Sequence, residues 1–155
     1  MLKKLFMTAH AARTASLDPL QKYRFRVIIP SISAEIGFTT ISGLNLEIGV
    51  TEYSEGGYPY AHKIPAKPKV GEITCEKGLY SGTQDMYNLV KSTLTNEDFR
   101  QTVIIQHLTR DGEVGIEYKL AECWASKWET GGLDASSDDV AMETLTLQFE
   151  YYLDD

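Results

Sequence analysis

Residues 102–120, TVIIQHLTRDGEVGIEYKL, carry the clearest fold signal in the chain: a strand, a tight turn and a returning strand. The segment 102–108 is rich in β-branched apolar residues, and residues 114–120 alternate apolar with polar side chains, a period of two typical of a half-buried strand. Between them, Asp111-Gly112 is a favoured pair for a hairpin turn. The stretch predicts an antiparallel β-hairpin, whose second strand we expect to continue through Trp124 to Trp128.

The flanking sequence repeats the same period of two. Residues 23–29 alternate until Pro30, which cannot donate a hydrogen bond to a strand ladder. Further strands are predicted over residues 38–41, 44–50, 70–76 and 144–153.

One helix is predicted between these strands, where Met86, Leu89, Val90 and Leu94 recur at helical spacing. Ser81 or Thr83 suits its N-cap. The pattern predicts a mainly β fold, an antiparallel β-barrel or sandwich of six or seven strands with one flanking α-helix.

Length and charge limit the classes of function. A chain of 155 residues is the usual size of one domain, which we expect over residues 18–155, preceded by an N-terminal arm, 1–17, that is mobile or contacts another subunit. The arm resembles a secretory signal only in part, because His10 and Arg13 interrupt its apolar stretch. A net charge of -7 disfavours binding to a phosphate backbone. No apolar run approaches the ~20 residues needed to span a bilayer, so we expect a soluble protein that does not bind membranes.

Residues 54–69, SEGGYPYAHKIPAKPK, stand apart in composition. Two glycines and three prolines in this segment predict a long exposed loop without a regular element, and long loops in compact domains are often functional. We expect Gly56-Gly57 to form the turn by which the loop leaves the barrel. Its three lysines suit an acidic partner.

No catalytic or cofactor motif is found in the sequence: there is no nucleophile elbow, no phosphate loop and no zinc spacing among His10, His62 and His107. We therefore expect neither an enzyme nor a cofactor. The acidic turn 134–139 has oxygen ligands for calcium but lacks EF-hand spacing, so a solvated turn is the simpler interpretation. Cys75 and Cys123 suit small buried hydrophobes in a reducing compartment, with a disulfide left open.

An ordered set of short motifs from Asp18 onward resembles the inner tail-tube proteins of contractile phages and of related contractile injection systems. The matching residues are Asp18-Pro19-Leu20, Tyr23 to Val27, Gly37-Phe38, Ser42-Gly43-Leu44, Glu47, Glu52-Tyr53, Glu55-Gly56-Gly57, His62-Lys63, Pro65, Lys67, Gly71 to Thr74, Lys77-Gly78, Trp124, Ser126 to Glu129, Leu133 to Ser137, Val140-Ala141, Glu143 and Leu145. The arm, 1–17, lies outside the pattern.

The resemblance implies a structural subunit: six copies form a ring, and rings stack into a hollow tube inside a contractile sheath, as the conduit for DNA. It implies as partners the sheath, baseplate and tail terminator, and as location a virion or extracellular particle assembled in the bacterial cytoplasm. It places a ring-stacking contact in the loop, at Tyr53, Glu55, Gly56, Gly57, Tyr58, Tyr60, His62, Lys63, Pro65 and Lys67. It also implies a sheath-facing helix, with Asp85, Asn88 and Lys91.

Two other classes of protein stay open. A tube of the same fold also serves a tailocin or an extracellular injection system that carries protein or no cargo. A small β-sandwich lectin or hydrolase is the more distant alternative, suggested by the aromatic residues Tyr23, Tyr53, Tyr58, Tyr60, Trp124 and Trp128.

Overall fold

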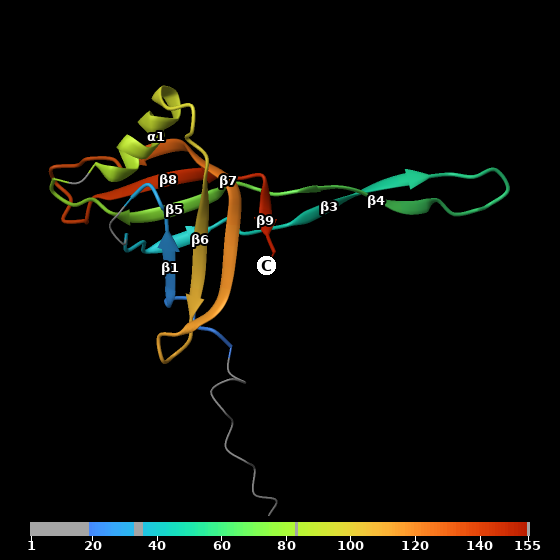
Figure 1. The fold of residues 1–155 in the computed structure, drawn as a ribbon, viewed down its shortest axis with the longest axis horizontal. Helices are drawn as coiled ribbons and strands as arrows, with labels where there is room; N and C mark the ends of the chain where they lie inside the picture. Colours follow the sequence, from blue (N-terminus) through green and yellow to red (C-terminus); the bar gives the residue numbers. More distant parts are fainter. Residues whose placement is uncertain (1–18, 33–35, 83, 155) are drawn as a thin grey trace, which may run out of the picture.

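A computed structural model describes residues 19–32, 36–82 and 84–154, so the N-terminal arm and the candidate cap Thr83 lie outside the described residues. A β-sheet body carries one helix on one side, and a long two-stranded hairpin projects from the body (Figure 1). The elements in chain order are β1 (Phe25–Ile28), β2 (Thr40–Ser42), β3 (Glu47–Tyr53), β4 (His62–Lys69), β5 (Ile73–Gly78), α1 (Asp85–Thr95), β6 (Gln101–Leu108), β7 (Val114–Thr130), β8 (Met142–Gln148) and β9 (Tyr151–Leu153).

The body is a seven-stranded sheet in the order β1-β6-β7-β8-β5-β2, with β9 paired to β7 beside that path. All its strand pairs are antiparallel, which confirms the predicted fold class. Strand β7 runs for 17 residues and changes partner along its length, from β6 in its first half to β8 in its second. Glu122, which has a positive φ of 53°, lies two residues before Trp124, where the pairing with β8 begins.

The core lies on one face of this curved sheet, beneath α1, and the predicted alternation places most of it. Ile73, Cys75, Val103, Leu120, Cys123, Leu145 and Leu147 are all almost completely buried. Both cysteines are free thiols. No helix among the described residues is long and apolar enough to cross a bilayer.

Two details of the predicted core are wrong, and so is one candidate for the helix cap. Tyr23, the first residue of the alternating stretch predicted as a half-buried strand over 23–29, is 69% exposed, because it precedes β1. Leu94, placed on the apolar face of the helix, is 87% exposed, because only Met86 and Leu89 are buried in α1. The N-cap of α1 is Gln84, without a side-chain hydrogen bond, so Ser81 does not cap the helix.

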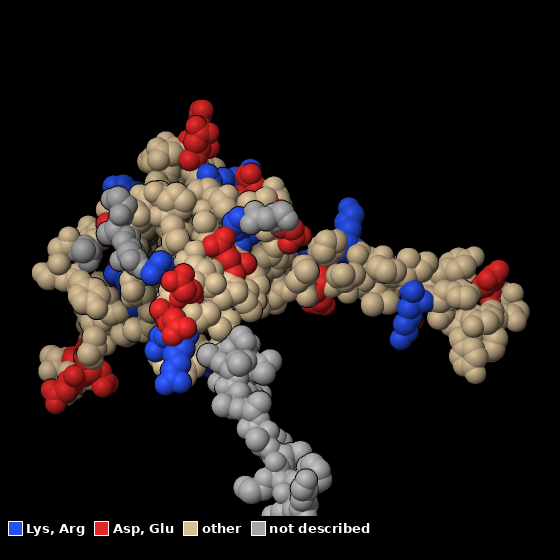
Figure 2. Space-filling model, turned by 60° about the horizontal axis from the view of Figure 1, so that its bottom comes forward, with Lys and Arg blue, Asp and Glu red and all other residues tan. Residues whose placement is uncertain are grey.

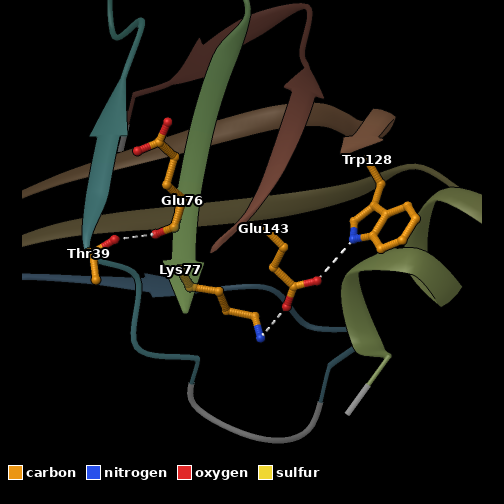
Figure 3. Close-up of polar contacts among 5 residues, drawn as sticks. All are labelled: Thr39, Glu76, Lys77, Trp128 and Glu143. Atoms are coloured by element: carbon orange, nitrogen blue, oxygen red, sulfur yellow. Dashed lines mark hydrogen bonds and ion pairs between the residues drawn. The ribbon is translucent and has the colours of Figure 1, made fainter. Parts of the chain in front are cut away.

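A buried ion pair lies inside the body and has no counterpart in the periodicity of the sequence (Figure 3). Lys77 of β5 and Glu143 of β8 stand opposite each other, and the Lys77 Nζ lies 2.6 Å from the Glu143 Oε1. The indole of Trp128 donates a hydrogen bond of 2.9 Å to the other carboxylate oxygen of Glu143. Because both charges are removed from water, the pair ties β5, β8 and the end of β7 together at fixed positions.

The largest departure from the prediction concerns residues 54–69. Instead of a loop, residues 62–69 form strand β4, which pairs with β3 in a separate two-stranded sheet. Only residues 54–61 are irregular. The strand tolerates Pro65 and Pro68 because it is an edge strand, where a missing N–H need not break the ladder.

Candidate self-assembly interface

The hairpin β3–β4 extends away from the body along the longest axis of the molecule (Figure 1). Its two strands pack mainly on each other, and both are exposed along nearly their whole length. In space-filling view it is a narrow arm with a mostly uncharged surface and a few separate charged side chains (Figure 2). An isolated two-stranded hairpin is at best marginally stable in water, and no other described strand pairs with either edge of this one.

Aromatic stacking orders the tip of the arm. The His62 ring stacks on Tyr58, with centroids 4.8 Å apart and an interplanar angle of 7°, and Tyr53 stacks on the same imidazole at 6.5 Å. Tyr60 meets Tyr58 edge to face, and the Glu55 carboxylate lies 3.7 Å from His62 Nε2. Five of the ten predicted contact residues, Tyr53, Glu55, Tyr58, Tyr60 and His62, thus form one cluster.

The two glycines lie at the far end of the hairpin, not at the point where the segment leaves the body, so that part of the prediction is wrong. The Tyr58 N–H donates to the Glu55 carbonyl and closes a turn over residues 55–58. Gly57 has a φ of +88°, a backbone conformation that favours glycine.

The lysines of the hairpin have acidic neighbours on the hairpin itself. Lys63 stands directly opposite Glu52, and Lys69 opposite Glu47. Facing pairs of opposite charge stabilise a two-stranded sheet. The prediction that all three lysines serve an acidic partner therefore needs correction, because two of them stand opposite carboxylates on β3.

Apolar side chains, in contrast, are left uncovered on the arm. Ile48, Val50 and Ile64 are about half exposed or more, as are Tyr53, Tyr58 and Tyr60. Leu46, just before β3, is 61% exposed. Exposed apolar residues gathered on a projecting element are typical of a protein–protein contact.

The foot of the hairpin is fixed by one asparagine. The Asn45 side-chain oxygen accepts a 2.7 Å hydrogen bond from the Gly71 N–H, which joins the two chains that lead into and out of the arm. The Asn45 carbonyl accepts a 2.9 Å bond from the Tyr152 hydroxyl on β9. Desolvation by burial raises the pKa of Tyr152, so the phenol remains protonated and keeps donating. These two bonds attach the arm to the body at a defined point.

The family of the chain follows from comparison with known proteins. A family model described as T4-like virus tail tube protein gp19 matches residues 21–152, which includes the whole hairpin and almost all of the body. The chain belongs to this tail tube family. No curated protein matches the chain.

Solved structures share the fold of this tail tube protein at low sequence identity. The sheath–tube complex of an extracellular contractile injection system, PVC, in its extended state superposes with a TM-score of 0.80 at 24% identity, covering 90% of this chain and 93% of that one. The tube-terminating cap of the anti-feeding prophage, AFP, gives 0.80 at 24% identity, with 95% and 97% covered. The AFP baseplate, described as six-fold symmetrised, gives 0.73 at 24% identity, with 88% and 95% covered.

The helix of the tail tube protein lies on one side of the body, where it packs against β7 (Figure 1). Of the three residues predicted to face the sheath, Asn88 and Lys91 are exposed and Asp85 is half-buried. Asp85 and Asn88 also border a hollow of about 430 Å³ beside α1, which Phe99 and Gln101 line from the strand side. The structure thus leaves two of the three side chains free to contact another protein.

The acidic turn of the tail tube protein is held by its own hydroxyl groups. Asp134 accepts hydrogen bonds from the backbone N–H and the hydroxyl of Ser136, and these bonds lower the pKa of its carboxyl group. Ser137 donates to Asp139 in the same way. Within the part of the chain that the structure describes, no three His, Cys, Asp or Glu residues come together as metal ligands.

Proposed function

We propose that this tail tube protein closes into rings of six subunits, and that the rings stack into the hollow inner tube of a contractile tail. Family membership and the projecting hairpin support the proposal, and the hairpin is the observation that carries it. The body of the same subunit does not cover the exposed apolar residues along both strands of the hairpin. A second copy offers a surface that covers them. The fold-related AFP baseplate was solved with six-fold symmetry.

The tube in this proposal is a conduit with no catalytic role. In a phage it carries DNA, and the acidic balance of the chain keeps a polyanion from adhering to the wall. A tailocin or an injection system would use the same tube for protein or for no cargo. Neighbouring genes separate these cases, because capsid and terminase genes indicate a phage.

The partners and place of action follow from the same proposal. A contractile sheath surrounds the tube and contacts the exposed side chains of α1, while a baseplate and a terminator close its two ends. The sheath–tube, cap and baseplate complexes in which related folds occur support these partners. The subunit assembles in the bacterial cytoplasm and acts in a phage tail or extracellular particle.

Sedimentation and negative-stain microscopy of the purified full-length chain test the assembly. Rings, and tubes at higher concentration, are expected. A chain that remains monomeric at the highest attainable concentration, with no rings in the images, contradicts the proposal.

The tip of the hairpin is tested by replacing Tyr58, Tyr60 and Lys63 with Ala together. We expect rings to stack poorly while the body keeps its circular dichroism spectrum, because the triple variant removes contact area at the tip but no core residue. Deletion of residues 1–17 tests the N-terminal arm in the same way: unchanged tube formation and stability would show that this segment has no structural role. Tubes of normal length from the triple variant would show that the tip takes no part in stacking.

A further inference from the structure

The two long edges of the hairpin differ in their capacity to bind a further strand. We propose that a strand of a second copy of this chain adds to the outer edge of β3, and that the outer edge of β4 is closed to such pairing by its prolines. This inference rests on the proposed self-assembly and specifies which edge performs it.

The direction of each backbone group follows from the register. In an antiparallel pair, directly opposed residues alternate between pairs that exchange both N–H···O bonds and pairs whose N–H and C=O groups point outward. Val50 stands opposite Pro65, and Ile48 opposite Pro68. Proline has no N–H, so neither pair can be of the mutually bonded kind. The backbone groups of Ile48 and Val50 therefore point outward from β3.

The same alternation fixes the pair nearest the tip. Glu52 and Lys63 stand opposite each other, two residues beyond Val50 and Pro65 with no shift of register between them. Their N–H and C=O groups point outward as well. The outer edge of β3 accordingly presents a donor and an acceptor at Ile48, Val50 and Glu52, an unbroken set at every second residue.

The outer edge of β4 is poorer in donors. Of its three corresponding positions, Lys63, Pro65 and Pro68, only Lys63 has an N–H to offer. The register shift between Ile48 and Val50 adds an extra residue on β4, which further disrupts its edge. Proline, lysine and bulges are the devices by which natural sheets prevent pairing at an edge. The two edges thus differ: the outer edge of β3 can bind a further strand, and the outer edge of β4 cannot.

The side chains on β3 favour a strand of the same protein as the occupant. Ile48 and Val50 lie on one face of the hairpin and are 57% and 63% exposed, so an added strand with apolar residues on that face would cover them. The body supplies a suitable edge: the segment Val114 to Tyr118 of β7 is bonded to β6 on one side, and no described strand is bonded to its other side. Its Val114 and Ile116 are also close to half exposed. Two such edges together form a continuous ladder with a shared apolar face.

Proline substitution at opposed positions tests the assignment. Glu52→Pro removes an outward N–H from β3, and Lys63→Pro removes the outward N–H of the residue directly opposite on β4. Both changes break the same cross-strand charge pair and leave the inner ladder bonds intact, which makes each the control for the other. Glu52→Ala and Lys63→Ala report the loss of the side chain alone.

The readout is the concentration at which rings form, measured by sedimentation on full-length protein. We expect Glu52→Pro to raise it at least about tenfold, equivalent to 1.4 kcal/mol per contact, and Lys63→Pro to stay within about twofold of Lys63→Ala. Loss of assembly in Lys63→Pro but not in Glu52→Pro, or an equal effect of the two, overturns the assignment of the edge. Wild-type protein that stays monomeric overturns the proposed function as well, so the two failures are distinguishable.

Hydrogen exchange on the wild-type chain gives a second measurement that does not depend on a variant folding. The amides of Ile48, Val50 and Glu52 are expected to exchange fast in the monomer and slowly after assembly, whereas the amide of Lys63 stays fast in both. Protection of Lys63 without protection of β3 would contradict the proposal.

Discussion

At the residue scale, the pair formed by Lys77 and Glu143 is the most demanding interaction in the body. Both side chains are almost fully buried, and the carboxylate is shared between the ammonium group and the Trp128 indole. Removing one partner leaves an uncompensated charge in the core, whereas replacing both with apolar residues of similar volume removes the desolvation cost as well.

We therefore expect Lys77→Met alone to lower the free energy of unfolding by about 3–5 kcal/mol. The double variant Lys77→Met with Glu143→Leu is expected to recover most of that loss, in urea denaturation followed by circular dichroism. The indole N–H of Trp128 loses its acceptor in the double variant, so we expect its free energy of unfolding to stay about 1 kcal/mol below that of the wild type. Equal stability of the wild type and the Lys77→Met variant would contradict the interpretation.

The two thiols provide a second prediction, on pH dependence. Desolvation by burial raises the pKa of both Cys75 and Cys123 to about 12, and for Cys75 the neighbouring Cys123 thiol adds to the effect. The folded state holds these protons more tightly than the unfolded chain. The contribution of the two thiols to the free energy of unfolding is therefore complete below pH 9 and is lost as the pH rises from about 9 to about 12.

At pH 10 each thiol should therefore contribute about 1 kcal/mol less than at pH 8. Urea denaturation at both pH values measures this, with the Cys75→Ala, Cys123→Ala double variant as the control that should lose less stability. At pH 8, neither thiol should react with a disulfide reagent until urea unfolds the chain. Fast labelling of the native protein would contradict the burial on which the prediction depends.

At the element scale, the sequence predicts what periodicity encodes and misses what tertiary contacts decide. The alternation in 102–120 and the Asp111-Gly112 turn place β6 and β7 correctly, because a half-buried strand must repeat every two residues. The same rule cannot detect β4, because that strand is exposed on both faces and its prolines are allowed only by its position at an edge.

The candidate interface could be predicted only in part for a similar reason. The tyrosines, prolines and glycines of 54–69 indicate a contact segment, and the structure gathers Tyr58, Tyr60 and His62 at one tip. What composition does not show is register. Only the pairing of β3 with β4 shows that Lys63 faces Glu52 on its own hairpin, and that Pro65 turns its missing donor outward.

The foot of the hairpin supports a prediction at this scale. Asn45→Ala removes the acceptor for the Gly71 N–H and leaves the hydrogen bond from Tyr152 in place, because that bond goes to the backbone. We expect a loss of about 1 kcal/mol in local stability, seen as faster hydrogen exchange at Gly71 and along β3, with the melting of the body little changed. Asn45→Asp, which keeps an acceptor, is the matched control. Faster exchange throughout the core would show that Asn45 supports the body and not the arm.

At the scale of the whole molecule, the proposed contacts between subunits are backbone ladders and apolar side chains, while two of the hairpin lysines stand opposite carboxylates of their own hairpin. Salt screens interactions between exposed charges over a length of about 10 Å at 0.1 M, but it leaves hydrogen-bonded ladders and apolar contacts largely unaffected.

Assembly is therefore expected to change less than about threefold in critical concentration between 0.05 and 0.5 M sodium chloride, measured by sedimentation. Exchange of charge at the facing pair near the body, Glu47→Lys with Lys69→Glu, serves as the control, since it keeps the pair and should assemble as the wild type does. Tubes that dissociate steeply with salt would mean that ion pairs between subunits dominate.

The attachment at Asn45 has a consequence that no single subunit displays. In a stack of rings, whatever angle the arm makes with its body is repeated at every step, so a small change of angle adds up along the length of the tube as twist. A substitution at the foot of the hairpin that hardly alters folding can therefore alter helical pitch. The hydrogen bonds from Gly71 and Tyr152 to Asn45 would in this way fix, through one residue, how far each ring turns relative to the next.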